Sequence, residues 1–166
     1  MELKVTQQVK ELIYDIQNKA YLTGQAREAD GTYNYEASSN MQVSDDLENS
    51  YQIRRSLATA FSSLKSLLGE YLQENTTTTD NLIDEEIDND GELVLTFEMP
   101  SNYNSSSADA LGAGIHSYLV DMSLSEWFAI TNKADASVYL EHSKVSLEYV
   151  RRALYKRSRP QRPNYS

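Results

Sequence analysis

The chain has 166 residues, and its 25 Asp and Glu against 15 Lys and Arg give a formal net charge of −10. This length suits one domain that buries its own core. The absence of cysteine excludes a disulfide framework, thiolate chemistry and Cys-based zinc or iron–sulfur sites. No apolar run approaches the roughly 18 residues that span a bilayer, and the charged N-terminal residues do not suit a secretory signal, so we expect no membrane association.

Two amphipathic helices are predicted in the first half of the chain. Apolar residues at steps of three and four predict the first helix from Leu3 to about Arg27. A loop rich in Ser, Asn and Tyr is expected from 32 to 43. The second helix is predicted from Asp45 to about Leu72, where Asp45 and Glu48 suit a capping box and Ser44 is the competing cap.

A change of period predicts a β-hairpin at about 81–99. Residues 92–99 alternate apolar and polar side chains, as a half-buried strand does, and Pro100 ends the run. We expect residues 81–87 to be the partner strand, joined through the turn residues 88–91. A lone hairpin is marginal in water, so it must pack on helices or pair with strands of a neighbouring subunit.

Two more helices are predicted after the hairpin, at about 108–130 and 134–157, and Pro160 stops the second of them. The expected fold is therefore mainly α: a four-helix bundle with a β-hairpin inserted between its second and third helices. We expect one helical domain at 1–149. Residues 150–166 would then form the end of the last helix and an extended basic tail.

No motif predicts catalysis, a cofactor or a metal site, and we expect a protein that is not an enzyme. The two histidines, His116 and His142, lack a second ligand at helical spacing, so a surface or partly buried role is expected for both. Gly112 and Gly114 lack the strand and third glycine of a dinucleotide loop, which favours close helix packing instead.

An acidic cluster lies near the predicted hairpin tip and resembles an EF-hand loop only superficially. We expect a solvated tip, with weak divalent-ion binding as the alternative. In a ring of subunits, such tips would line a channel and repel DNA, or contact the next subunit. The residues of this candidate site are Asp84, Glu85, Glu86, Asp88 and Asp90.

The charge of the chain is divided sharply between its body and its C-terminus. The last 17 residues carry six basic side chains and no acidic one, whereas the other 149 residues have a formal charge of −16. Three interpretations are open: a solvated terminus, contact with nucleic-acid phosphates, or docking on a partner protein. Five of the six cations are arginines, which favours fork-type pairing with carboxylates, phosphates or carbonyls.

The segment from Trp127 to Asp135, followed by a helix that ends in Arg151 to Pro160, resembles small neck proteins of tailed bacteriophages of gut bacteria. More generally, the chain is similar to the head–tail connector, or adaptor, family. The resemblance implies a small helical subunit that forms a ring, usually of twelve copies, beneath the portal. It also implies that the last helix and tail, here Arg151 to Pro163, reach into the portal and become ordered there.

The expected function is thus that of a structural virion protein, which bridges portal and tail and forms part of the DNA channel. Its expected partners are the portal protein, a tail or second neck protein, further copies of itself, and DNA that passes without specific binding. It would reside in the virion neck, and in the host cytoplasm during assembly. The expected partner-binding residues are Arg151, Arg152, Tyr155, Lys156, Arg157, Arg159 and Arg162.

Two alternatives share most of these features. One is a different neck or tail-completion protein of a phage. The other is a cytosolic helical binding or regulatory protein whose basic tail contacts nucleic acid, with a steep salt dependence.

Overall fold

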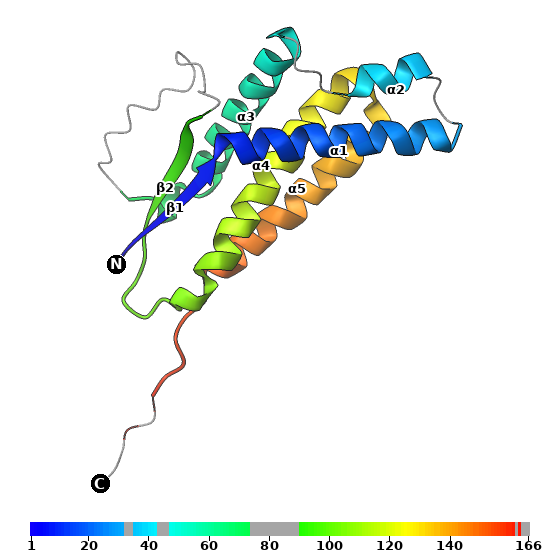
Figure 1. The fold of residues 1–166 in the computed structure, drawn as a ribbon. Coiled ribbons are helices and arrows are strands. Elements are labelled where there is room, and N and C mark those ends of the chain that lie inside the picture. The colour runs from blue at the N-terminus through cyan, green and yellow to red at the C-terminus, as the bar shows by residue number, and fades with distance from the viewer. Residues whose placement is uncertain (32–34, 43–46, 74–89, 162, 164–166) are drawn as a thin grey trace.

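The computed structural model describes residues 1–31, 35–42, 47–73, 90–161 and 163. These residues form five α-helices and a two-stranded antiparallel sheet, so the predicted mainly α class is confirmed (Figure 1). In chain order the elements are β1 (Glu2–Gln8), α1 (Val9–Ala29), α2 (Tyr35–Met41), α3 (Leu47–Leu67), a 3-10 turn (Gly69–Tyr71), β2 (Glu92–Glu98), a second 3-10 turn (Ser105–Ser107), α4 (Ala108–Thr131) and α5 (Lys133–Leu154).

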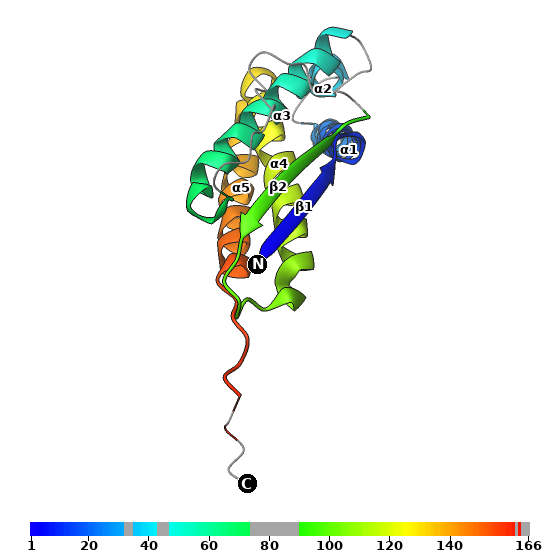
Figure 2. The ribbon, with the colours of Figure 1, turned by 90° about the vertical axis from the view of Figure 1, so that its left-hand side faces the viewer.

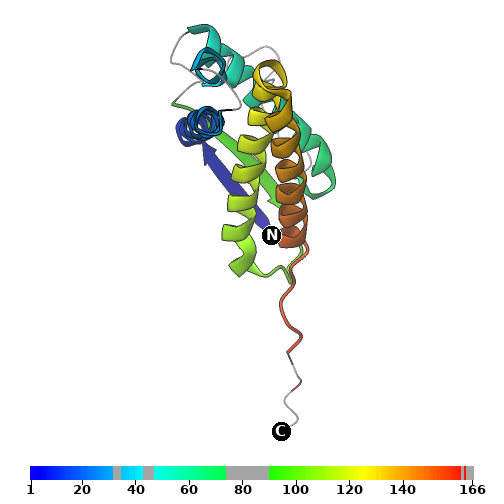
Figure 3. The same cartoon turned by 90° about the vertical axis from the view of Figure 1, so that its right-hand side faces the viewer.

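The helices α4 and α5 lie side by side at the centre of the fold (Figures 1 and 3). A single residue, Asn132, connects them in the sequence. The Asn132 side chain accepts a hydrogen bond from the Ala134 amide and so caps the start of α5. The two helices approach closely at Gly114, where an added Cβ would stand 2.9 Å from Cγ2 of Val150. The prediction that small residues serve close helix packing is confirmed at this position.

The remaining elements cover α4, which explains why α4 is apolar on several faces. Helix α1 crosses α4 and buries Leu12 and Ile16, while α3 also packs against α4 and buries Phe61 and Leu64. The sheet lies alongside the same helix (Figure 2). The core is thus centred on α4, and the outer faces of α1 and α5 remain at the surface.

The first predicted helix begins six residues later than expected, because residues 2–8 form the strand β1. Their burial alternates, with Leu3, Val5 and Gln7 on the covered side and the residues between them exposed. Val5 and Val9 are four residues apart, and a step of four fits both a strand and a helix. Pairing with β2 over its whole length decides between the two, since it satisfies the β1 backbone.

The predicted strand at 92–99 is confirmed as β2, and its strand partner among the described residues is β1. On the other edge of β2, Gln73 donates a backbone hydrogen bond to Thr96 (2.9 Å). Residues 74–89, which include the expected partner strand, lie outside the described residues. Within the described part of the chain, the sheet joins the N-terminus to β2, and the inserted hairpin stays a prediction.

The helices differ from the prediction at three further points. Helix α3 ends at Leu67 and not at about Leu72, since residues Gly69–Tyr71 form a 3-10 turn. The expected loop at 32–43 contains α2, whose last residue, Met41, is buried and accepts a hydrogen bond from Trp127 Nε1 (2.8 Å). Helix α5 ends at Leu154 and not at Arg157, because Lys156 to Ser158 bond to the linker before α4. The capping box predicted for α3 stays a prediction, because residues 44 and 45 and the side chain of Glu48 lie outside the described part of the structure.

Candidate partner-binding site at the end of α5

Two of the predicted partner-binding residues lie on the last turn of α5, and both are exposed. Arg151 has its side chain in solvent, and Arg152 pairs with Glu148 one turn earlier at 3.2 Å. Both members of this pair are more than half exposed, so it contributes little to stability. The two guanidinium groups are therefore available to an incoming partner.

The base of the basic tail is fixed to the body by backbone hydrogen bonds. The Asn104 amide donates to the Lys156 carbonyl (3.1 Å), and the Ser158 amide donates to the Asn102 carbonyl (2.7 Å). These bonds form a short antiparallel bridge between Tyr103 and Arg157. The tail consequently leaves the body after Ser158, at a defined point.

Arg157 has a structural role that its charge alone does not predict. Its guanidinium Nη1 donates to the carbonyls of Leu154 (2.8 Å) and Lys156 (3.2 Å). The carbonyls at the end of a helix carry partial negative charge and lack partners within the helix, so a cation there stabilises the helix end. Arg157 thus caps α5, and it differs in this from the other predicted partner-binding residues that the structure describes.

Two tyrosines of the neighbouring linkers pack around the base of the tail. The ring of Tyr71 meets that of Tyr155 edge-to-face at 5.6 Å. Burial, followed by the neighbours Tyr155 and Glu70, raises the pKa of the Tyr71 hydroxyl above its ordinary range. Burial likewise raises the pKa of Tyr103, against the opposing charge of Arg157, and the Tyr103 hydroxyl has no hydrogen-bond partner among the described residues. Both hydroxyls therefore stay neutral at physiological pH.

A groove of about 840 Å³ runs between the N-terminal half of α4 and the C-terminal half of α5. Its floor is made of small side chains, and its rim carries tyrosines and cations. Three predicted partner-binding residues, Arg152, Tyr155 and Lys156, line it together. The other lining residues are Ser107, Ala110, Ala113, Gly114, Ser117, Ser146, Tyr149 and Ala153.

This groove is the part of the site that the sequence analysis missed. Its only sequence signal is the run of small residues on α4, with Ala110, Gly114 and Ser117 at helical spacing. Such a run fits close packing within the chain equally well, and Gly114 does serve that purpose. The groove becomes visible only once α4 and α5 are placed together.

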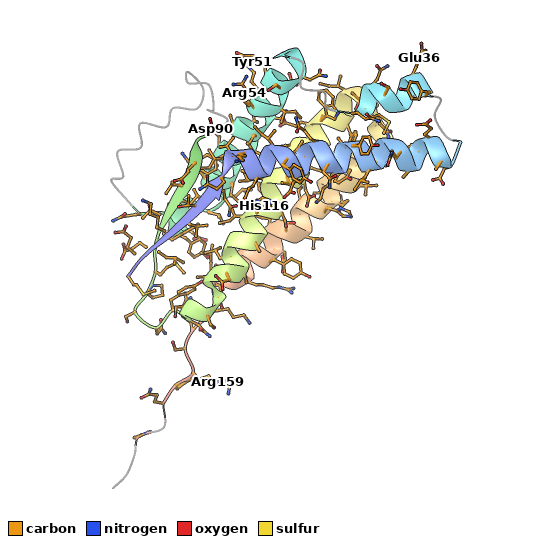
Figure 4. All side chains as sticks on the ribbon, viewed as in Figure 1. Glu36, Tyr51, Arg54, Asp90, His116 and Arg159 are labelled. Atoms are coloured by element: carbon orange, nitrogen blue, oxygen red, sulfur yellow. The ribbon has the colours of Figure 1, made fainter. Side chains whose placement is uncertain are left out.

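Beyond Ser158 the tail extends away from the body (Figure 1). Arg159 is exposed and stands clear of the helices in Figure 4, while Arg162 lies outside the described residues. Of the predicted acidic site only Asp90 is described. It sits in the turn before β2, well away from Arg159 (Figure 4). The other four acidic residues lie outside the described residues.

The two histidines occupy unlike surroundings. His116 joins three elements, since its Nε2 lies 2.5 Å from Asp15 Oδ2 on α1 and its Nδ1 lies 3.2 Å from Gln7 Oε1 on β1. His142 is exposed, and its ring meets that of Tyr139 edge-to-face. Among the described residues, no group of three or more His, Cys, Asp or Glu side chains is placed to hold a metal ion.

Comparisons with known proteins give this chain no relative: no family model, no curated protein and no solved structure matches it. Within the described ranges, none of the helices combines the length and apolar character that crossing a membrane requires.

Proposed function

We propose that this protein is a structural component of a phage virion neck, a head–tail connector subunit that joins the portal to the tail around the DNA channel. The observation that carries the proposal is the tail. Residues 150–166 hold six basic and no acidic side chains in an otherwise acidic chain. Four of these cations precede Ser158, where the chain is fixed to the body, and the part beyond Ser158 carries the other two and projects from the body (Figure 3). A segment of this kind suits insertion into a pocket of a larger partner.

The acidic charge of the body agrees with a place beside DNA. Two negatively charged surfaces repel, so DNA passes an acidic wall without sticking to it. We propose that the segment that holds Asp84, Glu85, Glu86, Asp88 and Asp90 has one of two roles. It either lines the channel and repels DNA, or contacts the next subunit. In this proposal the subunits form a ring, with twelve copies as in the family that the chain resembles.

The test is partner capture with a tail truncation that spares the core. Val150, Ala153 and Leu154 are buried, so the truncated chain must keep α5 and end at Ser158. Tagged full-length and 1–158 chains are incubated with a nuclease-treated lysate of the phage-producing host, and bound proteins are identified by mass spectrometry. We expect the full chain, and not the 1–158 chain, to retain a large oligomeric portal protein.

A charge reversal tests whether portal capture depends on the basic charge of the tail or only on the tail being present. Arg159→Glu with Arg162→Glu should abolish portal capture. Lys133→Glu with Lys144→Glu makes the same charge change at exposed positions of α5 and should leave capture intact. Retention of nucleic acid alone before nuclease treatment, lost at moderate salt and in the 1–158 chain, would instead identify a nucleic-acid-binding protein.

A further inference from the structure

The exposed face of α5 carries the spacing of a helix–helix seam. Val138, His142, Val145, Tyr149 and Arg152 follow one another at steps of four and three, and all are exposed. Val138, Val145 and Tyr149 are 47%, 53% and 60% accessible. Steps of four and three place side chains along one line of a helix, as at the contact line of a coiled coil.

The valines in this seam have no role within the described chain. Valine is a poor helix former because its branched side chain loses rotamers in a helix, and exposing it to water brings no compensation. The seam leads directly into the α4–α5 groove, since Tyr149 and Arg152 belong to both. Seam and groove therefore form one continuous surface, which we call the α5 face.

A second exposed seam lies on α1, at the same spacing. Glu11, Tyr14, Asn18, Tyr21 and Gln25 follow at steps of three and four, and all are exposed. Tyr14 and Tyr21 are 66% and 45% accessible, and the adjacent Leu22 is 52% accessible. We call this surface the α1 face. The two tyrosines are one heptad apart, or roughly 10 Å along the helix.

We infer that the α1 face of one copy packs into the α5 face of the next copy, and that this head-to-tail contact builds the oligomer. The inference deepens the proposed ring and rests on that proposed function. Large side chains on α1 meet a groove floored by Ala110, Ala113 and Gly114, where small residues admit a close approach. A contact between two unlike faces repeats from subunit to subunit, and it closes into a ring when the rotation between neighbouring copies divides a full turn.

Charge selects the partner of the groove. Each copy carries a net charge of −10, so copies repel unless opposite charges meet at the contact. The groove rim supplies Arg152 and Lys156, whereas the α1 face begins with the exposed acid Glu11. This complementarity favours α1 of a second copy over the basic tail as the occupant of the groove.

The absence of cysteine makes a direct test available. Tyr14→Cys or Tyr21→Cys is placed in one tagged full-length chain, and Ala113→Cys in a second, untagged full-length chain. All three positions are exposed, so the fold should be kept, which circular dichroism checks. The two chains are mixed, oxidised mildly and resolved without reductant. Mass spectrometry then separates mixed from like pairs.

We expect the mixed disulfide to form at least five-fold above the yield from Tyr35→Cys with Ala113→Cys. Tyr35 is 74% accessible but belongs to α2, which makes it the matched control. A yield equal to that control, or disulfides only between two Ala113→Cys chains, would overturn the head-to-tail contact.

A charge exchange tests the complementarity separately. Arg152→Glu with Lys156→Glu, added to the Ala113→Cys chain, should lower the mixed disulfide to the control level. Glu11→Lys in the other chain should then restore it. Failure to restore the yield contradicts the assigned pairing of charges.

The two proposals fail in distinguishable ways. Portal capture without the mixed disulfide would support the proposed connector function and contradict the contact between the α1 and α5 faces. The mixed disulfide without any captured virion protein would support that contact and contradict the connector function.

Discussion

Gly114 on α4 and Val150 on α5 stand so close that the structure leaves no space for a methyl group between them. A Cβ at Gly114 would lie 2.9 Å from Cγ2 of Val150 and 3.5 Å from its backbone nitrogen. Val150 is fully buried and its branched side chain is stiff at χ1, so it cannot turn away. This contact fixes the separation of the two central helices.

Gly114→Ala is therefore expected to destabilise the protein. Overpacking of this kind costs about 1–3 kcal/mol, which exceeds the gain of about 1 kcal/mol in helix propensity. Gly112→Ala is the matched control, because its Cβ would meet Val5 Cγ1 at an ordinary 3.9 Å. We expect urea unfolding to show a lower midpoint for Gly114→Ala and an equal or higher midpoint for Gly112→Ala. Equal midpoints for the two variants would contradict the close contact.

The C-terminal end of α5 is buried, so we expect truncation there to destabilise the fold. Removing residues 150–166 deletes Val150 and Leu154, both fully buried, and so exposes the apolar surface that these side chains cover. Losing one buried aliphatic side chain typically costs about 2–5 kcal/mol, so the 1–149 chain should melt far lower or fail to fold. The 1–158 chain keeps these residues, and calorimetry should give it the same melting temperature as the full chain. A 1–149 chain of unchanged melting temperature would show that this end of α5 is dispensable.

The ion pair between Arg27 and Asp135 ties α1 to the start of α5. Arg27 Nε lies 3.0 Å from Asp135 Oδ2, Nη2 lies 2.5 Å from Oδ1, and the carboxylate is buried. Arg27→Ala would leave this carboxylate without its cation, which should cost about 2–4 kcal/mol in unfolding free energy.

The control for this variant is Arg152→Ala. Arg152 pairs with Glu148 at the surface, and that loss should cost less than about 1 kcal/mol in the same measurement. Equal losses for the two variants would show that burial adds nothing to the Arg27 pair.

Glu126 on α4 gives a prediction about pH. Burial raises the pKa of its carboxyl, and the hydrogen bond from Ser56 only partly opposes the shift. The folded chain therefore holds this proton more tightly than the unfolded chain does, and the contribution of Glu126 to stability falls as pH rises through its folded pKa. Glu126→Gln should therefore raise the melting temperature at pH 7.

Below the unfolded pKa of a glutamate, roughly 4.3, both states of the wild type are protonated at this residue. The difference between Glu126→Gln and the wild type should therefore shrink as the pH is lowered from 7 to 4. A difference that stays constant over this range would show that the ionisation of Glu126 does not affect stability.

The sequence predicts the long helices well and the short or distant pairings poorly. Helices α3, α4 and α5 each bury one stripe or more, and the periodicity of those stripes located all three. Helix α2 has only seven residues and no stripe of its own, and it is held by contacts such as that of Met41 with Trp127. The strand β1 depends on a partner far along the chain, which no local window contains.

The candidate partner-binding site was predicted from charge alone, which names residues but gives no geometry. Counting cations located the tail, and the structure places Arg152 and Lys156 on one groove. Counting could not show that Arg157 caps α5, because that role depends on where the Leu154 carbonyl points. Nor could it show the groove, which two helices create together.

The pairing of β1 with β2 has a consequence for the order of events during synthesis. The nearest paired residues, Gln8 and Glu92, are 84 positions apart. At 5–20 residues per second, β1 leaves the ribosome roughly 4–17 s before its partner has been translated. During that interval β1 is an open edge that can join a neighbouring nascent chain. Polysomes that crowd such chains together should therefore favour misassembly, and slowing initiation should raise the yield of correctly folded protein.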